Sequence, residues 1–298
     1  MADNPYSSTY DTVIDSETRQ WMKLMTGIQD DDELKKHILD FQVAPYPSVT
    51  SLTFLRRRMS DHFAYEQVLN LGREREGALL LEMGCFGIEL RGVVADGFPA
   101  KQIMASDLNA ESWELGHSFH RSTPESFPVT FLAGDALDPE FLSSIPCNVE
   151  TQEPLDLSHI STLNDLKGKC SAICARNFFH LFDEAQQYWL AHALGSLLSP
   201  EKGSIILGSH VGGPEKRLIT HKAVAGRERT FFHTPSSWEE LWTKTLPTNH
   251  EDGTAQEKDV LKRSVFRFGE VTVETSIEFI NLTIGLDGYY MNWSVTRL

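Results

Sequence analysis

Basic residues are scarce in this chain: 27 Lys and Arg stand against 42 Asp and Glu among 298 residues, a formal net charge of −15 at pH 7. A surface of this sign repels phosphate backbones, so we do not expect nucleic acid as a partner. No apolar run reaches the roughly 18 residues that a membrane span needs. The first residues also lack the basic start and apolar stretch of a signal peptide. We therefore expect a cytoplasmic protein.

Cysteine is scarce as well, and its spacing excludes the common metal sites. The four cysteines include no pair of the Cys-x-x-Cys type. We expect buried or half-buried free thiols and no bound metal. The hydrophobic share of 41% is enough for one large domain, or for one domain with a small addition. The cysteines are Cys85, Cys147, Cys170 and Cys174.

The first 75 residues show a helical pattern. Residues 1–15 are polar and predict a mobile tail, or a flap that covers a ligand. Apolar residues then recur at helical spacing in four short segments. We expect a helical cap or lid over residues 1–75. Its apolar positions include Trp21, Leu24, Met25, Ile28, Leu34, Ile38 and Phe41, and the later helices cover 54–59 and 64–71.

From residue 76 to the end, strand and helix patterns alternate, which predicts a parallel sheet with crossover helices. A polar, irregular segment at about 139–168 interrupts this core as an insertion. The expected fold is α/β and Rossmann-like, with a seven-stranded sheet that ends in a C-terminal β-hairpin. The expected strands are 78–83, 102–107, 129–134, 171–175, 204–209, 271–280 and 290–297, with helices at 88–95, around 113–115, at 183–198 and from 236.

A turn with two glycines follows the first of these strands. The strand ends in Glu82, and Gly84 and Gly87 let the backbone approach a ligand closely. The dinucleotide fingerprint Gly-x-Gly-x-x-Gly is absent. A glycine pair at such a place is often only a turn, so this feature needs support from elsewhere.

Two further acids supply that support. Asp107 ends the next strand, and Asp135 follows the third. A carboxylate after the second strand can accept both ribose hydroxyls of a nucleoside, and one after the third can accept the amino group of adenine. Each Asp alone is also a common helix cap. Three acids after three successive strands favour a nucleoside site.

Several motifs give the chain a family resemblance. It resembles the fungal class I S-adenosylmethionine-dependent methyltransferases of meroterpenoid and polyketide biosynthesis, among them carboxyl-methylating enzymes. The resemblance implies the class I methyltransferase fold and S-adenosylmethionine as cofactor, bound by Glu82, Gly84, Gly87, Asp107, Leu108, Asp135 and Ala136. The matching stretches are Pro45-Tyr46-Pro47, Phe54-Leu55, Gly84 to Gly87, Leu90-Arg91, Val94 to Gly97, Ser106 to Leu108, Phe178 to Phe182 and Ser294 to Leu298.

The glycine turn departs from the family pattern. The family has three residues between the glycines, whereas only two separate Gly84 from Gly87. A one-residue change reorients every N–H of a tight turn. Two outcomes stay open: the turn binds the cofactor in an adjusted shape, or binding is weakened or lost. The fourth strand also lacks the more usual Asp.

The substrate side is poorer in signal. His180 follows the fourth strand and His210 ends the fifth, so we expect both to face the cleft as acid-base groups. For each, a packing or capping role is the alternative. The expected substrate-binding residues are Tyr46, Arg176, Asn177 and Phe179, with a lid from the segment that holds His221, Arg229 and His233.

The sequence therefore supports three functions. The first is an O-methyltransferase acting on an apolar natural-product intermediate. The second is a methyltransferase-fold isomerase, cyclase or pericyclase that transfers no methyl group, with the cofactor structural or lost. The third, a non-catalytic binding protein, has the least support. The sequence leaves a homodimer open.

Overall fold

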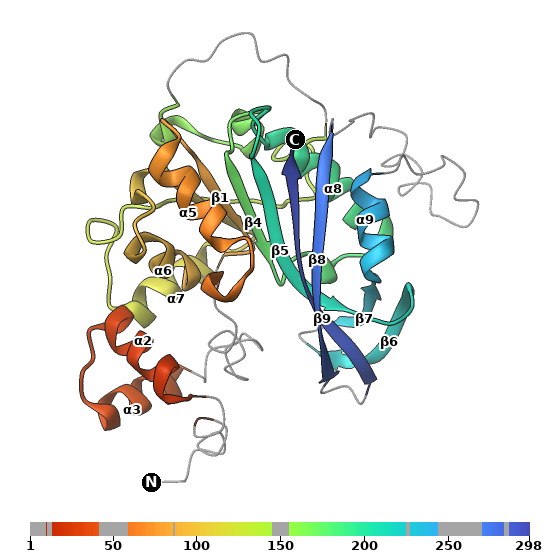
Figure 1. The fold of residues 1–298 in the computed structure, drawn as a ribbon. Helices are drawn as coiled ribbons and strands as arrows, with labels where there is room; N and C mark the ends of the chain where they lie inside the picture. Colours follow the sequence, from red (N-terminus) through yellow and green to blue (C-terminus); the bar gives the residue numbers. More distant parts are fainter. Residues whose placement is uncertain are drawn as a thin grey trace.

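A computed structural model describes residues 10, 14–41, 59–85, 87–144, 155–224, 227–243, 270–282 and 286–298. Its centre is a seven-stranded sheet with the order β3-β2-β1-β4-β5-β9-β8, and helices lie on both of its faces (Figure 1). The five strands from β3 to β5 are parallel, and β9 runs antiparallel to β5. This order and the closing antiparallel hairpin are those of the Rossmann-like class I methyltransferase fold, as the sequence predicts.

The strands lie close to their expected positions. β1 is continuous with a run of apolar residues, so both of its faces can be buried, as a central parallel strand requires. The long β8–β9 hairpin closes one edge of the sheet. The strands are β1 Leu80–Met83, β2 Ile103–Asp107, β3 Thr130–Ala133, β4 Ala172–Arg176, β5 Ile205–Gly212, β8 Val271–Leu282 and β9 Leu286–Arg297.

Each face of the sheet packs against its own helices. α5 Tyr65–Glu74, α6 Glu89–Ala95 and α7 Ala110–His120 cover one face, where Leu80, Leu90 and Phe98 belong to a buried cluster. α8 Glu184–Leu197 and α9 Pro235–Thr243 cover the other face, where the core contains Leu190, Trp238 and Trp293 (Figure 1). The three described cysteines are buried free thiols, as expected: Cys170 lies in this core, and Cys85 and Cys174 lie in the cluster on the opposite face.

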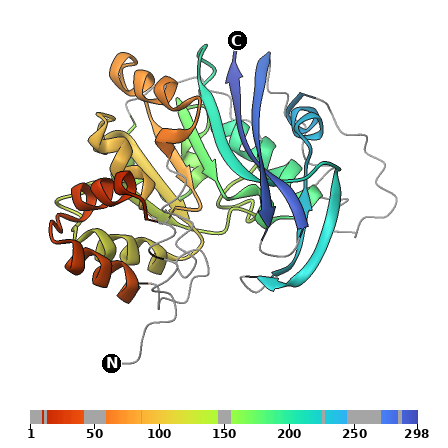
Figure 2. The ribbon, with the colours of Figure 1, turned by 60° about the horizontal axis from the view of Figure 1, so that its bottom comes forward.

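The N-terminal helices form a small third core. Asp15 caps the N-terminus of α2 Ser16–Thr26, and its side chain accepts a hydrogen bond from the Thr18 N–H at 2.7 Å. α2 and α3 Asp31–Phe41 pack beside α7 (Figure 2). Tyr10 and Ile14 are buried in this core at 2% and 3% exposure. These two residues therefore do not belong to a mobile tail, because packing against the helices holds them. The expected helix over 54–59 lies outside the described residues, apart from Met59.

A second, two-stranded sheet was not predicted from the sequence. β6 Arg217–Val224 pairs with β7 Arg227–Phe232 beside the β8–β9 hairpin (Figure 2). The expected insertion at 139–168 contains, in its described part, two short 3-10 helices, η4 Leu157–His159 and η5 Leu163–Leu166. Leu163 and Leu166 are fully buried, so this segment belongs partly to the core. In the described part of the chain, no helix combines the length and apolar character that crossing a membrane requires.

Candidate functional site

The loops after β1, β2 and β3 meet at one edge of the sheet. The Gly84 N–H donates to the Ser106 carbonyl at 2.9 Å, and the Gly134 N–H donates to the Asp107 carbonyl at 3.0 Å. Because each loop is hydrogen-bonded to the end of its neighbour, the three acids predicted from the sequence are brought to a common edge. This is the carboxyl edge of the parallel strands, where ligands bind in open α/β sheets.

The glycine turn is held by its own side chains. Gly84 and Gly87 both have φ of +70°, a conformation that side-chain-bearing residues rarely adopt. The Cys85 thiol donates to the Glu82 carboxylate at 2.5 Å, and the Gly87 N–H donates to the Cys85 sulfur at 3.1 Å. The turn with two intervening residues is therefore a hydrogen-bonded structure.

Glu82 is the most deeply buried acid of this edge, with 5% of its surface exposed. Burial, aided by the nearby Glu89 carboxylate, raises the pKa of Glu82 to about 8. Glu82 therefore holds a proton at neutral pH in the unliganded protein. A buried acid with a strongly perturbed pKa is a common mark of a functional site.

Asp107 and Asp135 share one local geometry. Each accepts the N–H two residues ahead through Oδ1, Asp107 from Asn109 at 3.0 Å and Asp135 from Leu137 at 2.9 Å. These turns fix the direction of each carboxylate. Asp107 is half-buried, and burial raises its pKa, while Asp135 is exposed.

The chemistry of this edge fits a nucleoside. Carboxylates accept from ribose hydroxyls and from an exocyclic amine, and both groups are donors. Leu108 is 63% exposed beside Asp107, whereas Ala136 is 8% exposed beside Asp135. The exposed Leu108, adjacent to the oriented carboxylate of Asp107, offers an apolar surface for a base. The residues present therefore fit the adenosine part of the expected cofactor.

A buried cation lies where β4 ends. Arg176 is ion-paired with Glu89 in the first turn of α6, and their side chains are 5% and 20% exposed. Burial, the largest single effect, opposes the charge of Arg176, but the Glu89 carboxylate together with Tyr290 and Cys174 outweighs it and raises the Arg176 pKa. Burial likewise raises the pKa of Glu89, against the effect of Arg176. Sequence analysis placed Arg176 at the substrate but did not identify Glu89 as its partner.

A chain of hydrogen bonds runs from Arg176 to the surface. The Arg176 Nε–H donates to the Ser209 hydroxyl at 3.2 Å, and that hydroxyl lies 2.8 Å from the hydroxyl of Tyr290. Tyr290 in turn donates to Asn177 Oδ1 at 3.2 Å. Asn177 is exposed and left-handed, with φ of +50°. Ser209 of β5 and Tyr290 of β9 thus connect the side chains of the consecutive residues Arg176 and Asn177.

His210 faces the opposite side of β5 from Ser209, toward α9. It is 1% exposed and packs against Trp238, with 4.4 Å between the ring centroids. The Trp293 indole N–H donates to His210 Nδ1 at 2.9 Å, so the neutral ring carries its proton on Nε2. His210 therefore does not line an open cleft, in contrast to the expectation from the end of its strand.

The other predicted substrate residues fall into two groups. Phe179 is fully buried against Trp238, with 5.0 Å between ring centroids, while His180 beside it in η6 Phe179–Leu181 is half-buried. Tyr46 and the side chain of His221 lie outside the described residues. Arg229 is exposed on β7, and His233 is buried at 2% exposure.

Buried neutral histidines give the protein a steep stability change at acid pH. Burial lowers the pKa of His62 to about 4 and those of His120 and His233 to about 3, and it places that of His210 well below the usual range. The unfolded chain binds protons at these positions from about pH 6.5 downward. Stability is therefore full above that pH and is lost as the pH falls toward 4, by up to about 1.4 kcal/mol per pH unit for each histidine.

We expect the unfolding midpoint in urea to fall continuously between pH 6.5 and pH 4.5. Three carboxyl groups with raised pKa values, Glu82, Glu89 and Asp107, act in the opposite direction over this range. They oppose five histidines whose pKa is lowered, since burial also lowers the pKa of His117. His120→Leu should flatten the pH profile, whereas His159→Leu, at a side chain that is 83% exposed, serves as the control. A profile that His120→Leu leaves as steep as before would contradict the assignment of His120.

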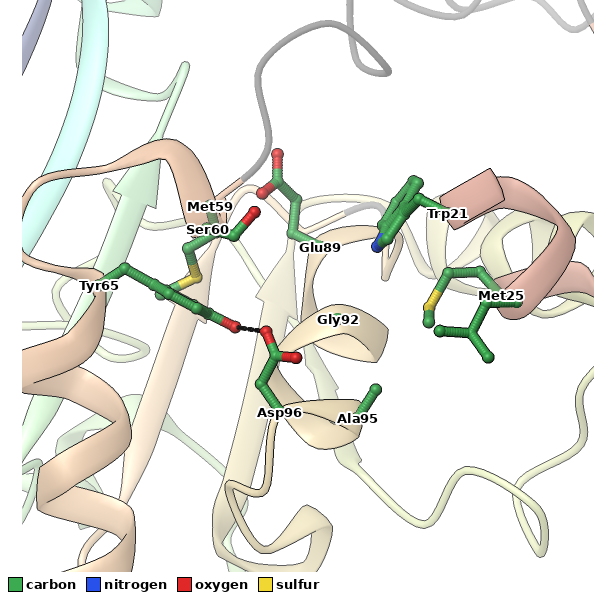
Figure 3. Close-up of a pocket in the computed structure, with 10 residues that line it drawn as sticks. Trp21, Met25, Met59, Ser60, Tyr65, Glu89, Gly92, Ala95 and Asp96 are labelled. Atoms are coloured by element: carbon green, nitrogen blue, oxygen red, sulfur yellow. Dashed lines mark hydrogen bonds between the residues drawn. The ribbon is translucent and has the colours of Figure 1, made fainter. Parts of the chain in front are cut away.

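A pocket of about 210 Å³ lies between α2, α5 and α6 (Figure 3). Trp21 and Met25 approach from α2, and Tyr65 donates a hydrogen bond to Asp96 at 2.6 Å on the opposite wall. Glu89 also lines this pocket, so it is close to the Arg176 ion pair. The three loops that carry Gly84, Asp107 and Asp135 do not contribute to it.

Comparison with known proteins identifies a set of fungal relatives. Residues 6–55 match the family model "Meroterpenoid methyltransferase N-terminal domain". The O-methyltransferase phiE of a fungal species (strain ATCC 74256) is 28% identical over 74% of this chain and 65% of its own length. The methyltransferase adrK of Penicillium rubens is 28% identical over 72% of this chain and 70% of its own.

A third relative is the Asnovolin E/Chermesin D methyltransferase nvfJ of Aspergillus novofumigatus, 29% identical over 68% of this chain and 64% of its own length. The chain thus spans about two thirds of the length of the curated relatives that it matches. These matches confirm the predicted resemblance to fungal natural-product methyltransferases.

Solved structures give weaker likenesses. An S-adenosylmethionine-dependent methyltransferase from Methanosarcina mazei is 10% identical and covers 74% of this chain and 92% of its own, with a TM-score of 0.45. The fold assignment therefore depends on the strand order of the sheet.

Proposed function

We propose that this protein is an S-adenosylmethionine-dependent O-methyltransferase of fungal secondary metabolism. The observation that carries the proposal is the edge at which Glu82, Asp107 and Asp135 are held by three interlocked loops. The resemblance to named fungal methyltransferases agrees with it. Gly84, Gly87, Leu108 and Ala136 would complete the cofactor site.

The cofactor supplies an electrophilic methyl group, and the protein positions the acceptor oxygen in line with it. Asp107 would orient the ribose, and Asp135 the adenine amine. A small, apolar acceptor would enter from the side of Arg176 and Asn177. An acceptor carboxylate is already ionised at neutral pH and needs no base, whereas a hydroxyl needs one. His180, which is half-buried, is the candidate for that base, whereas His210 is buried against Trp238 and away from an open cleft.

Calorimetric titration tests this function directly. We expect S-adenosylhomocysteine to bind the purified protein with a micromolar Kd and one site per chain. Adenosine should bind at the same site, because it keeps the ribose hydroxyls and the amino group that Asp107 and Asp135 would accept. It should bind more weakly, because it lacks the amino-acid part of the ligand. Absence of any binding heat at millimolar concentrations of S-adenosylhomocysteine would exclude the proposed methyl transfer.

A second function keeps the fold without the transfer. The half-buried His180, in the short helix η6 that follows β4, is the acid-base group that such an isomerase, cyclase or pericyclase of natural-product biosynthesis would use. In that case product forms without cofactor and has the mass of the substrate. Mass spectrometry of the product, with and without S-adenosylmethionine, separates the two functions.

We further propose a cytoplasmic location for the protein. Whether it forms a homodimer is tested by size-exclusion chromatography with light scattering.

A further inference from the structure

Arg91 is a buried cation that the proposed catalytic site leaves without a role. It lies on α6, four residues after Gly87 of the glycine turn, and is 7% exposed. Among the described residues, no Asp or Glu forms an ion pair with it. Burial lowers the pKa of Arg91 to about 10, so it stays charged at neutral pH. A buried guanidinium without a carboxylate is costly unless its hydrogen bonds do something specific.

The hydrogen bonds of Arg91 join two elements of the cofactor edge. Nη1 donates to the carbonyl of Gly87, the last residue of the glycine turn. Nη2 donates to the Ser122 hydroxyl at 2.6 Å, just beyond the end of α7, where His117 Nδ1 lies 3.4 Å away. The guanidinium also lies over the ring of Phe127, 4.2 Å from its centroid. Arg91 therefore ties the turn after β1 to the helix that follows Asp107.

The turn has little freedom around this contact. A Cβ at residue 87 would lie 2.9 Å from Trp113 and 3.1 Å from Arg91 Nη1. The Gly87 N–H is already held by the Cys85 sulfur, which bonds to Glu82. Both peptide groups of Gly87 are thus fixed, one from the strand and the other from Arg91. In this turn, which is one residue shorter than the family pattern, the direction of the Gly87 carbonyl is therefore fixed by Arg91, a residue outside the turn.

We propose that Arg91 is a positioning residue that holds the Gly84–Gly87 turn in the shape that accepts the amino-acid part of the cofactor. This inference rests on the proposed function. Loss of Arg91 would release the Gly87 carbonyl and let the turn rotate, while the carboxylates of Asp107 and Asp135, fixed by their own turns, would stay in place. Affinity for the amino-acid part should fall and affinity for adenosine should not.

The test compares two ligands in matched variants. Arg91→Met should lower the affinity for S-adenosylhomocysteine about tenfold or more, the usual effect of losing one hydrogen bond to a charged group. Adenosine affinity should change less than twofold, and Arg91→Lys should restore part of the loss. Arg73→Met is the control, because Arg73 makes the equivalent bond to the Asp96 carbonyl at the far end of α6, at 3.1 Å. Equal losses for the two ligands, or no loss for either, would overturn the proposal.

Hydrogen exchange provides a readout that does not depend on the cofactor. In the unliganded protein, Arg91→Met should speed exchange in peptides that cover residues 82–90, and Arg73→Met should leave them unchanged. Ser122→Ala, which removes only the partner of Nη2, should show the same pattern at a smaller size if Arg91→Met does not fold. Failure of the wild-type protein to bind either ligand counts against the proposed function alone. Unchanged exchange in both the Arg91 and Ser122 variants counts against the positioning role.

Discussion

Asp107→Asn is expected to weaken binding of S-adenosylhomocysteine about 100-fold, and Asp107→Ala more strongly. The carboxylate can accept both ribose hydroxyls at once, whereas an amide offers only one oxygen and turns its NH₂ group toward donors. Each hydrogen bond to a charged acceptor contributes about 1.5–3 kcal/mol. The loss of one ribose hydrogen bond, together with the repulsion between the amide NH₂ and the second hydroxyl, is therefore enough for a change of about 100-fold in affinity. Calorimetry on the folded variants measures the change.

Asp138→Asn provides the matched control for this change. Asp138 accepts the Glu140 N–H at 2.9 Å through Oδ1, which is the same local turn that Asp107 and Asp135 make. It lies three residues after Asp135 and is exposed. Loss of turn geometry alone would therefore appear in both variants. If Asp107→Asn binds the ligand as the wild type does, the nucleoside site is elsewhere on the protein.

The position of Asp107 could be predicted because the sheet gives a simple rule. Buried apolar runs identify the parallel strands, and parallel strands place the residues that follow them at one edge. Glu82, Asp107 and Asp135 needed no more than this rule. The β6–β7 hairpin escaped prediction because its sequence is polar and the preceding Gly212-Gly213 pair resembles a loop.

The contacts that shape the site depend on distances in space that the sequence does not reveal. Arg176 and Glu89 are 87 residues apart, and Arg91 and Ser122 are 31 apart. His210 illustrates a different limit. Successive residues of a strand alternate between faces, so the position at the strand end did not decide whether His210 or Ser209 faces Arg176. For the positioning role proposed for Arg91, the sequence offered one signal: a charged residue on the otherwise apolar, buried side of a helix.

The Arg176–Glu89 ion pair of the site has both of its side chains largely buried, at 5% and 20% exposure. Both charges are largely removed from water, and the Glu89 carboxylate is, after burial, the next cause of the raised pKa of Glu82 nearby. Arg176 therefore compensates the buried charge of Glu89, which lies near a second buried acid, Glu82. Removing one member of a buried pair leaves an uncompensated charge, which costs more than the pair itself contributes.

Arg176→Met is expected to lower the free energy of unfolding by about 3–5 kcal/mol, measured by urea denaturation at pH 7. Glu89→Gln should be destabilising as well, because it leaves Arg176 buried without its carboxylate. The double variant Arg176→Met/Glu89→Leu should recover most of the loss, since it buries no charge at either position. An exposed pair offers the control: Arg73→Met, which breaks the ion pair of Arg73 with Glu66 at side chains 44% and 67% exposed, should cost less than about 1 kcal/mol. Additive losses in the double variant would show that the two charges do not compensate one another, and that the destabilisation comes from packing.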